Sequence, residues 1–217
     1  TLFRSNYYTL SMNIVDDDID YNIKIICLKN GKKQIKVNDI PLEKGIELIG
    51  RVKIVIFTQE DMQLLRGNPQ DRRNQFDRFI SLINYNYKNS LLLYNKILKQ
   101  RNFLLKNVKK ETSKLEELDI WDSSLSKIGA ILISDRLKIV NELNKMIGII
   151  NIDLSSKSEF VRIVYSTDVN YEKIDNSKIE YFENELYKKM KLNVYNDVKM
   201  GFTTVGPHKD DYIFFIN

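Results

Sequence analysis

The chain has 217 residues, 43% of them apolar, which is enough for one or two domains with a real hydrophobic core. Its 34 Lys and Arg against 29 Asp and Glu give a formal net charge of +5, which allows a polyanionic partner without requiring one. No long uncharged apolar run occurs, which excludes a membrane-spanning helix, and the first residues lack the pattern of a signal peptide. The single cysteine, Cys27, excludes an internal disulfide, so we expect a buried packing residue in a reducing, cytoplasmic compartment. The missing initiator methionine predicts a segment of a longer protein.

The first third of the sequence favours β structure. In residues 21–30, apolar and polar residues alternate and a short apolar run follows. "GKK" (31–33) is typical of a turn, and apolar and polar residues alternate again in 34–39, which predicts a hairpin. Residues 51–58, "RVKIVIFT", predict a third strand inside a sheet.

A helix is predicted to follow Gly67. Asn68 is suited to cap its N-terminus, Pro69 to occupy the first helical position, and Asp71 to complement the helix dipole. One face of this helix is expected to carry Phe76, Phe79, Ile80 and Ile83.

Two longer stretches have the period of coiled-coil helices. In the first, steps of four and three join Tyr87, Leu91, Tyr94, Leu98, Arg101, Leu105, Val108, Thr112 and Leu115. After a break near Asp119, the second joins Trp121, Leu125, Ile128, Leu132, Asp135 and Ile139. Two such helices with a short polar link predict an antiparallel hairpin.

Each of these two seams contains one charged residue. Counting outward from the break places Arg101 and Asp135 within about one helical turn, a rise of about 5 Å. We hypothesise that they pair and fix the register of the hairpin. The alternative is that one of the two side chains extends to solvent.

The last third predicts mixed structure: a strand at 159–167, an amphipathic helix at 178–192 and a closing strand at 211–217. Strands, then helices, then strands again indicate that a helical block is inserted into an α/β domain.

The only histidine, His208, lies in "GPHKDD" (206–211), just before the closing strand. One interpretation is a charged loop before an edge strand, and the other is a functional site. His208, Asp210 and Asp211 could in principle hold a divalent cation for a phosphoesterase, but one histidine and two adjacent acids specify a metal poorly, and we predict no metal site. The sequence contains no glycine-rich phosphate loop and no G-x-S-x-G motif.

Basic residues cluster along the sequence more clearly than any group of candidate catalytic residues does. Between 88 and 110 there are seven and no acid, namely Lys88, Lys96, Lys99, Arg101, Lys106, Lys109 and Lys110. A second cluster consists of Arg66, Arg72, Arg73 and Arg78. Such strips can follow phosphates, mainly through the nucleic-acid backbone, although a charged run is also typical of a solvated helix face. The DNA-binding candidates are Arg66, Arg72, Arg73, Lys96, Lys99, Lys106, Lys109 and Lys110.

Four stretches, in order and with similar spacing, resemble motifs of the RecF recombination proteins. They are "VIFTQEDMQLLRGNPQDRRNQFD" at 55–77, "LKQRNFLLK" at 98–106, "WDSSLSKIGAILISDR" at 121–136 and "GPHKDD" at 206–211. Four collinear matches are more specific than any one of them. The sequence departs from the family pattern in two places. Gln59 stands where a proline is usual, and Asn74 and Gln75 make the segment after Arg73 less basic and less apolar than in the family.

The resemblance implies an α/β fold, in which part of an ABC-type ATPase head sheet, related to SMC and Rad50 proteins, carries an inserted helical lobe with the antiparallel hairpin. Residues 1–66 would belong to the head, 67–158 to the lobe and 159–217 to the head again. The phosphate loop would precede this chain, and the signature motif and Walker B acids would follow it. The chain alone is therefore expected to be inactive.

The resemblance also implies a role in DNA replication, repair, recombination and the SOS response. The longer parent would bind DNA at gaps, dimerise around ATP, and recruit mediator proteins that load a recombinase. Expected partners are single-stranded, gapped or linear double-stranded DNA and mediator proteins, and no membrane. ATP and Mg²⁺ would serve the parent without binding tightly to this chain. The other interpretation is a helical-hairpin module that binds a protein and does not touch DNA.

Two groups of residues would lie near the nucleotide in this family. They are Gln59, Glu60 and Asp61, where sheet and lobe join, and His208, Lys209 and Asp210, near the dimer face. We assign the second group to loop organisation or communication across that face, and not to bond cleavage.

Overall fold

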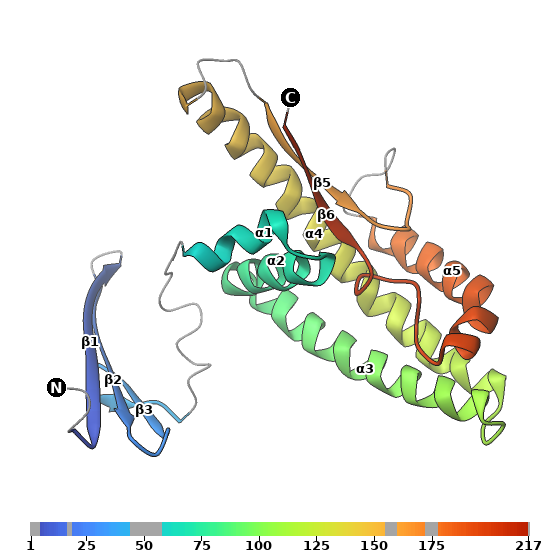
Figure 1. Cartoon of the computed structure of the whole chain (residues 1–217), viewed down its shortest axis with the longest axis horizontal. Helices are drawn as coiled ribbons and strands as arrows, with labels where there is room; N and C mark the ends of the chain where they lie inside the picture. Colours follow the sequence, from blue (N-terminus) through green and yellow to red (C-terminus); the bar gives the residue numbers. More distant parts are fainter. Residues whose placement is uncertain (1–4, 17–18, 44–57, 155–159, 172–177, 217) are drawn as a thin grey trace. The chain divides into compact units, whose positions relative to one another are not determined.

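Two units make up the chain, residues 1–55 and 56–217, and each is described by itself. The computed structural model describes residues 5–16, 19–43, 58–154, 160–171 and 178–216 (Figure 1). Among these residues, no helix is long and apolar enough to cross a membrane.

The first unit is an antiparallel sheet in the order β1–β2–β3–β4. Its strands are β1 (Tyr7–Asp16), β2 (Ile19–Leu28), β3 (Lys33–Val37) and β4 (Ile40–Pro41). The predicted hairpin is confirmed as β2 and β3, with Gly31 in the turn at a φ of 81°, where glycine is favoured. Cys27 is buried, as expected. Strand β1 was not predicted, and residues 51–57 of the predicted third strand lie outside the described residues.

The second unit is mainly helical. Its elements are the short 3₁₀ helix η2 (Gln59–Met62), α1 (Gln63–Arg66), α2 (Pro69–Ile83), α3 (Tyr85–Lys109), η3 (Leu115–Glu117), α4 (Leu118–Leu154), β5 (Val161–Ser166), α5 (Ile179–Met200) and β6 (Asp211–Ile216). Helix α2 begins as predicted: the Asn68 side chain accepts hydrogen bonds from the backbone of Gln70 and Asp71, and the Asp71 side chain accepts one from Asn68.

Helices α3 and α4 form the predicted antiparallel hairpin (Figure 1). Leu104 and Leu105 pack against Leu118 at the closed end, whereas Tyr87 shares a core cluster with Leu132 further along. Two details of the prediction were wrong. Helix α3 ends at Lys109, so Thr112 and Leu115 lie outside it, and α4 continues past Ile139 to Leu154.

The face predicted for α2 is only half correct. Phe76 and Ile80 are buried, whereas Phe79 and Ile83 are exposed. The reason is that α2 packs mainly on β6 and α3, which cover the Phe76 and Ile80 side of the helix.

Strands β5 and β6 pair antiparallel, with Tyr165 opposite Tyr212. This ribbon packs on helices through a core that includes Ile163, Tyr165 and Tyr212 from the strands, Phe76 from α2, Ala130, Ile133 and Leu137 from α4, and Phe182 and Leu186 from α5. The Phe76 and Tyr212 rings are stacked, with centroids 3.7 Å apart. The predicted strand at 159–167 and the predicted helix at 178–192 are therefore present, the helix longer than expected. Whether 159–217 rejoins one domain with residues 1–66 stays a prediction.

Candidate functional site

The segment that contains "GPHKDD" connects the end of α5 to β6. Helix α5 ends at Met200 and is capped by Gly201, whose φ of 76° is left-handed and whose backbone N–H donates to Asp197 O. Gly206 follows with a φ of 128°. A Cβ atom at Gly206 would lie 2.6 Å from the hydroxyl oxygen of Tyr94 on α3. The turn therefore needs glycine here both for its backbone conformation and for the close approach of α3.

His208 is held at both of its ring nitrogens. Its Nε2 lies 3.0 Å from the carbonyl oxygen of Thr203, and a carbonyl can only accept, so Nε2 carries the proton. Nδ1 is then the acceptor, and the Tyr94 hydroxyl donates to it at 2.8 Å. Burial lowers the pKa of His208 to about 4, so the ring is neutral at pH 7. With both ring nitrogens bonded within the chain, His208 joins the 203–208 turn to α3. Its role in loop organisation or communication stays a prediction.

The two acids that follow His208 have separate partners. Tyr165 donates a hydrogen bond to the buried carboxylate of Asp210, and burial raises the pKa of Asp210 to about 7. Asp211 accepts two bonds of 2.7 Å from Arg72. The carboxylates and the imidazole do not converge, and no group of three potential ligands is found in the described part of the chain. The geometry does not support a metal-dependent phosphoesterase.

Arg72 and Arg73 were predicted to contact DNA, and the structure corrects this prediction. Arg72 bonds Asp211 and the carbonyl oxygen of Gly67. Arg73 is only 7% exposed and donates to Asp210 O at 2.6 Å and to Gln70 at 2.7 Å. Both guanidinium groups therefore attach the N-terminal turns of α2 to the start of β6, and neither is free for a phosphate.

Arg136 of α4, which the sequence did not single out, bonds to α2, α3 and the turn before β6. It is 2% exposed and forms a two-oxygen ion pair with Asp77 of α2 at 2.8 and 3.0 Å. Its guanidinium also donates to the Tyr87 hydroxyl at 2.9 Å and to Pro207 O at 2.7 Å. A buried arginine needs such partners for each N–H group, and here they place the turn at Pro207 against the helices.

The predicted pair of Arg101 and Asp135 is wrong. Arg101 is fully buried and bonds Asp122 at 2.6 Å and Asp197 at 2.7 Å. Asp135 instead lies 3.6 Å from Lys138, one helical turn away. The counting argument assumed two helices, whereas α5 brings Asp197 to the hairpin as a third partner. Arg101 also donates to Thr203 at 2.8 Å, so this cluster holds the start of the 203–210 turn.

The remaining predicted residues lie apart from this network. The Asp61 carboxylate accepts from the backbone N–H and the hydroxyl of Thr58, so it caps η2. The side chains of Gln59 and Glu60 lie outside the described residues. Lys209 is exposed, with its ammonium 4.8 Å from the centre of the Phe202 ring. Of the basic residues that the sequence grouped into two clusters, the exposed ones are Arg66, Arg78, Lys96, Lys99, Lys106, Lys109 and Lys110.

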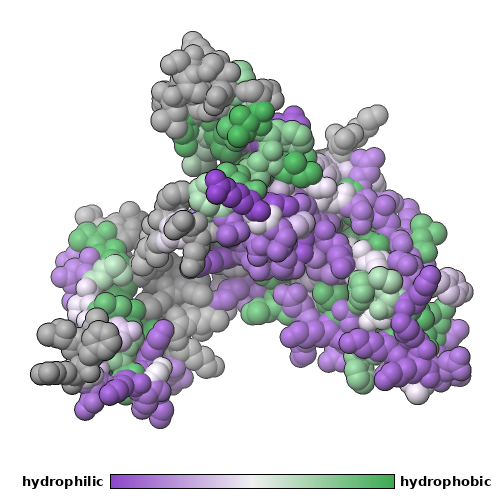
Figure 2. Space-filling model, in the orientation of Figure 1, coloured by the Kyte–Doolittle hydropathy of each residue, from purple (hydrophilic) through white to green (hydrophobic). Residues whose placement is uncertain are grey.

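The exposed lysines of α3 lie opposite its buried side. Lys96, Lys99 and Lys106, together with Lys110 directly after the helix, follow at spacings of three, seven and four, which put them on one face. The Lys109 ammonium donates to the carbonyl oxygen of Lys199 at 2.6 Å. Leu92 and Phe103 are also exposed on this face, 58% and 64% respectively. Figure 2 shows the helical unit as a mainly hydrophilic surface with separate apolar patches.

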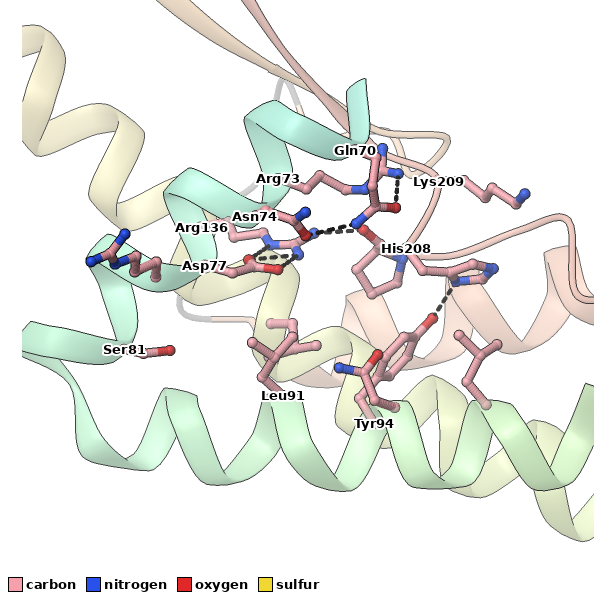
Figure 3. A pocket seen from close by; sticks show the side chains of 15 residues that line it. Gln70, Arg73, Asn74, Asp77, Ser81, Leu91, Tyr94, Arg136, His208 and Lys209 are labelled. Carbon is pink, nitrogen blue, oxygen red and sulfur yellow. Dashed lines mark hydrogen bonds and ion pairs between the residues drawn. The ribbon is translucent and has the colours of Figure 1, made fainter. Parts of the chain in front are cut away.

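A cavity of about 530 Å³ lies between α2, α3 and the 207–209 turn (Figure 3). Its walls include Gln70, Asn74 and Arg78 of α2, Leu91 and Leu98 of α3, and Lys209. The Tyr94–His208 pair and the Asp77–Arg136 pair also line it, so the network described above forms part of its wall.

Comparison with known proteins identifies relatives along almost the whole chain, although no protein-family model matches it. The "DNA replication and repair protein RecF" of Clostridium beijerinckii is 38% identical over 208 residues, which are 96% of this chain and 53% of that protein. The RecF protein of Lachnospira eligens is 34% identical over 210 residues, 96% of this chain and 54% of that protein. The chain thus spans about half the length of the curated relatives it matches.

Solved structures agree with this relationship. Two structures of the recombination mediator protein RecF in the RecFOR pathway, one described as RecF-ATPrS and the other as RecF-ATP, are each 30% identical. Their TM-scores are 0.84 and 0.81, and each match covers 99% of this chain and 57% of the solved chain.

Proposed function

The chain is a homologue of the RecF DNA replication and repair proteins over slightly more than half of their length, and we propose that it supplies the DNA-binding helical lobe of such a protein. The lobe would be joined to part of an ABC-type ATPase head. Exposed apolar side chains at the end of the β5–β6 ribbon and of α4 support this extension, because they would be covered by a larger sheet: Ile149, Ile150, Phe215 and Ile216.

The outer face of α3 carries the proposal. Its lysines are exposed, and no acid occurs from residue 85 to residue 110, so nothing on the helix neutralises them. From Lys96 to Lys110 the face extends about 21 Å, the length of about six base pairs of B-form DNA. Contacts of this kind attract the phosphate backbone without reading bases. Gapped, single-stranded and linear double-stranded DNA are all suitable ligands.

We propose ATP binding only for the longer parent protein. The solved relatives include one described as RecF-ATP, and ATP-dependent dimerisation with Mg²⁺ is our proposal for the parent. The sequence contains no phosphate loop, and the Asp61 carboxylate accepts hydrogen bonds from Thr58. We therefore assign no ATP chemistry to these residues. Recruitment of mediator proteins, in replication, recombination and the SOS response, is likewise proposed for the parent.

One observation favours a second function. Leu92 and Phe103 expose apolar surface on the same face of α3 as the lysines, where a protein partner could cover it. The alternative is therefore a helical-hairpin module that binds a protein partner and does not touch DNA.

Fluorescence anisotropy with labelled gapped and single-stranded DNA separates the two functions. The test variant replaces Lys96, Lys99, Lys106, Lys109 and Lys110 by Glu, and Lys127→Glu, on an exposed part of α4, is the control. If α3 binds DNA, the five-site variant loses binding at least tenfold and the control does not. Unchanged DNA binding by the five-site variant, or no binding by the unmodified chain, would favour the protein-interaction module.

A further inference from the structure

The cavity between α2 and α3 is elongated. Gln70 and Ser81, which both line it, are eleven residues apart on one helix, a rise of about 16 Å. Leu91 and Leu98 of α3 form the floor of this groove, and the 207–209 turn closes one end (Figure 3). An extended peptide rises about 3.4 Å per residue, so about five residues would fill this length.

The floor of this groove is aliphatic. Leu91 and Leu98 are partly exposed above the buried core residue Leu132. Tyr94 also lines the groove but is only 1% exposed, and its hydroxyl is hydrogen-bonded to His208. Single-stranded nucleic acid is usually held by aromatic faces on which bases stack. The described lining offers no open aromatic face of that kind and instead suits an aliphatic side chain.

The rim along α2 presents oriented amides. Arg73 donates to Gln70 Oε1 at 2.7 Å, and Gln70 Nε2 donates to Asn74 Oδ1 at 2.8 Å. This chain of bonds uses the oxygen of Asn74 and leaves its two amide N–H groups as donors. Asn95, on the α3 side, is exposed. Side-chain amides on both rims match the backbone of an extended peptide, which offers a carbonyl and an N–H group at each residue.

The free charges of the groove are positive. Four basic residues and one acid line it, and the acid, Asp77, is already paired with Arg136. Arg73 is bonded internally, as described above. Arg78 is exposed and has no hydrogen bond or ion pair with any other residue that the structure describes. Lys209 contacts only the Phe202 ring through its ammonium among these residues. Arg78 lies on the open α2 wall, and Lys209 lies at the closed end.

We propose that this groove binds an extended acidic peptide segment of a partner protein, with aliphatic side chains on the leucine floor and carboxylates at Arg78 and Lys209. Charge-assisted hydrogen bonds from Arg78 and Lys209 would fix the direction and register of the segment. The inference goes beyond DNA binding and does not depend on it, because the groove and the lysine face of α3 share no residue.

The test measures binding of a fluorescein-labelled hexapeptide of alternating Asp and Leu to the chain by anisotropy. Arg78→Glu and Lys209→Glu are each expected to weaken binding about tenfold, since each variant places a carboxylate opposite a carboxylate. Both side chains are exposed, so both variants should fold. The control Lys127→Glu makes the same change of charge on α4, outside the groove, and should change binding less than twofold.

Two further probes complete the experiment. A peptide with serine in place of each leucine should bind at least tenfold more weakly, because it cannot bury aliphatic surface on the floor. A twelve-residue oligothymidylate should not compete for the groove. The proposal is overturned if the hexapeptide does not bind, if the control variant weakens binding as much as Arg78→Glu does, or if the oligonucleotide displaces the peptide and its own affinity falls in Arg78→Glu. Loss of DNA binding in the five-lysine variant has no bearing on these outcomes.

Discussion

The hydroxyl group of Tyr94 donates a hydrogen bond of 2.8 Å to Nδ1 of His208, which is 114 residues later in the chain. The bond attaches the middle of α3 to the turn before β6. Arg136 holds the same turn through Pro207 O, and Arg101 holds its start through Thr203. The only histidine of the chain is therefore part of a scaffold that fixes one end of the groove.

Gly206→Ala should disrupt this scaffold. The added Cβ would lie 2.6 Å from the Tyr94 hydroxyl oxygen, in addition to the strain of a φ of 128°. Gly31→Ala is the matched control, because its φ of 81° is also positive but its Cβ would meet nothing within 4 Å. We expect Gly31→Ala to lower the free energy of unfolding by about 1 kcal/mol and Gly206→Ala by at least about 2 kcal/mol. Urea titration of each variant measures both, and equal losses would contradict the close approach of Tyr94.

Stability should depend on pH through His208 and Asp210 in opposite directions. Burial lowers the pKa of His208 from 6.5 to about 4, so its stabilising contribution is present above pH 6.5 and is lost as the pH falls toward 4. Burial raises the pKa of Asp210 from 3.8 to about 7, so its contribution is present below pH 3.8 and is lost as the pH rises toward 7.

Single variants separate these two slopes. Between pH 4 and 7, the free energy of unfolding of Asp210→Asn should rise with pH more steeply than that of the unmodified chain, because only the His208 effect remains. For His208→Gln, the free energy of unfolding should decrease with rising pH relative to that of the unmodified chain, because only the Asp210 effect remains. Urea titrations at four pH values, followed by the fluorescence of the single tryptophan, Trp121 on α4, measure the slopes. Parallel pH profiles for all three proteins would show that neither group titrates as described.

The buried cluster at Arg101 predicts a large difference between two aspartates. Asp197→Asn removes one buried charge that faces Arg101 at 2.7 Å, and breaking such a pair typically reduces stability by about 3–5 kcal/mol. Asp135→Asn touches only the 3.6 Å pair with the exposed Lys138, which is worth less than about 1 kcal/mol. Urea titration should rank the variants in this order. A comparable loss in Asp135→Asn would restore the pairing that the sequence first indicated.

The local parts of this fold could be predicted because their causes are local. The side chains of Asn68 and Asp71 cap α2 by accepting from backbone N–H groups two or three residues away, and Pro69 starts the helix. The apolar spacing from Tyr87 onward follows one side of a helix. The hairpin of β2 and β3 follows from alternation around Gly31. Strand β1 was missed because its residues were considered only as a candidate targeting segment.

The contacts that build the groove were not predictable in this way. Arg136 finds Asp77 59 residues away and Pro207 71 residues away, and nothing in the neighbouring sequence marks those partners. Asp197 reaches Arg101 only because α5 packs on the hairpin. Arg72 and Arg73 looked like a DNA-binding pair in the sequence, and the structure gave them internal partners. Asp122, the other partner of Arg101, lies next to Trp121 in a stretch that resembles a RecF motif, and this resemblance could have pointed to it.

The central claim, that the outer face of α3 binds the DNA backbone, is tested most directly by the salt dependence of binding. The logarithm of the association constant for single-stranded DNA should fall with the logarithm of salt concentration by about 0.7 for each phosphate contact. Replacing Lys96, Lys99, Lys106, Lys109 and Lys110 by Glu should therefore make the slope shallower by about 3.5. An identical slope for the variant and the unmodified chain would show that these lysines do not contact DNA.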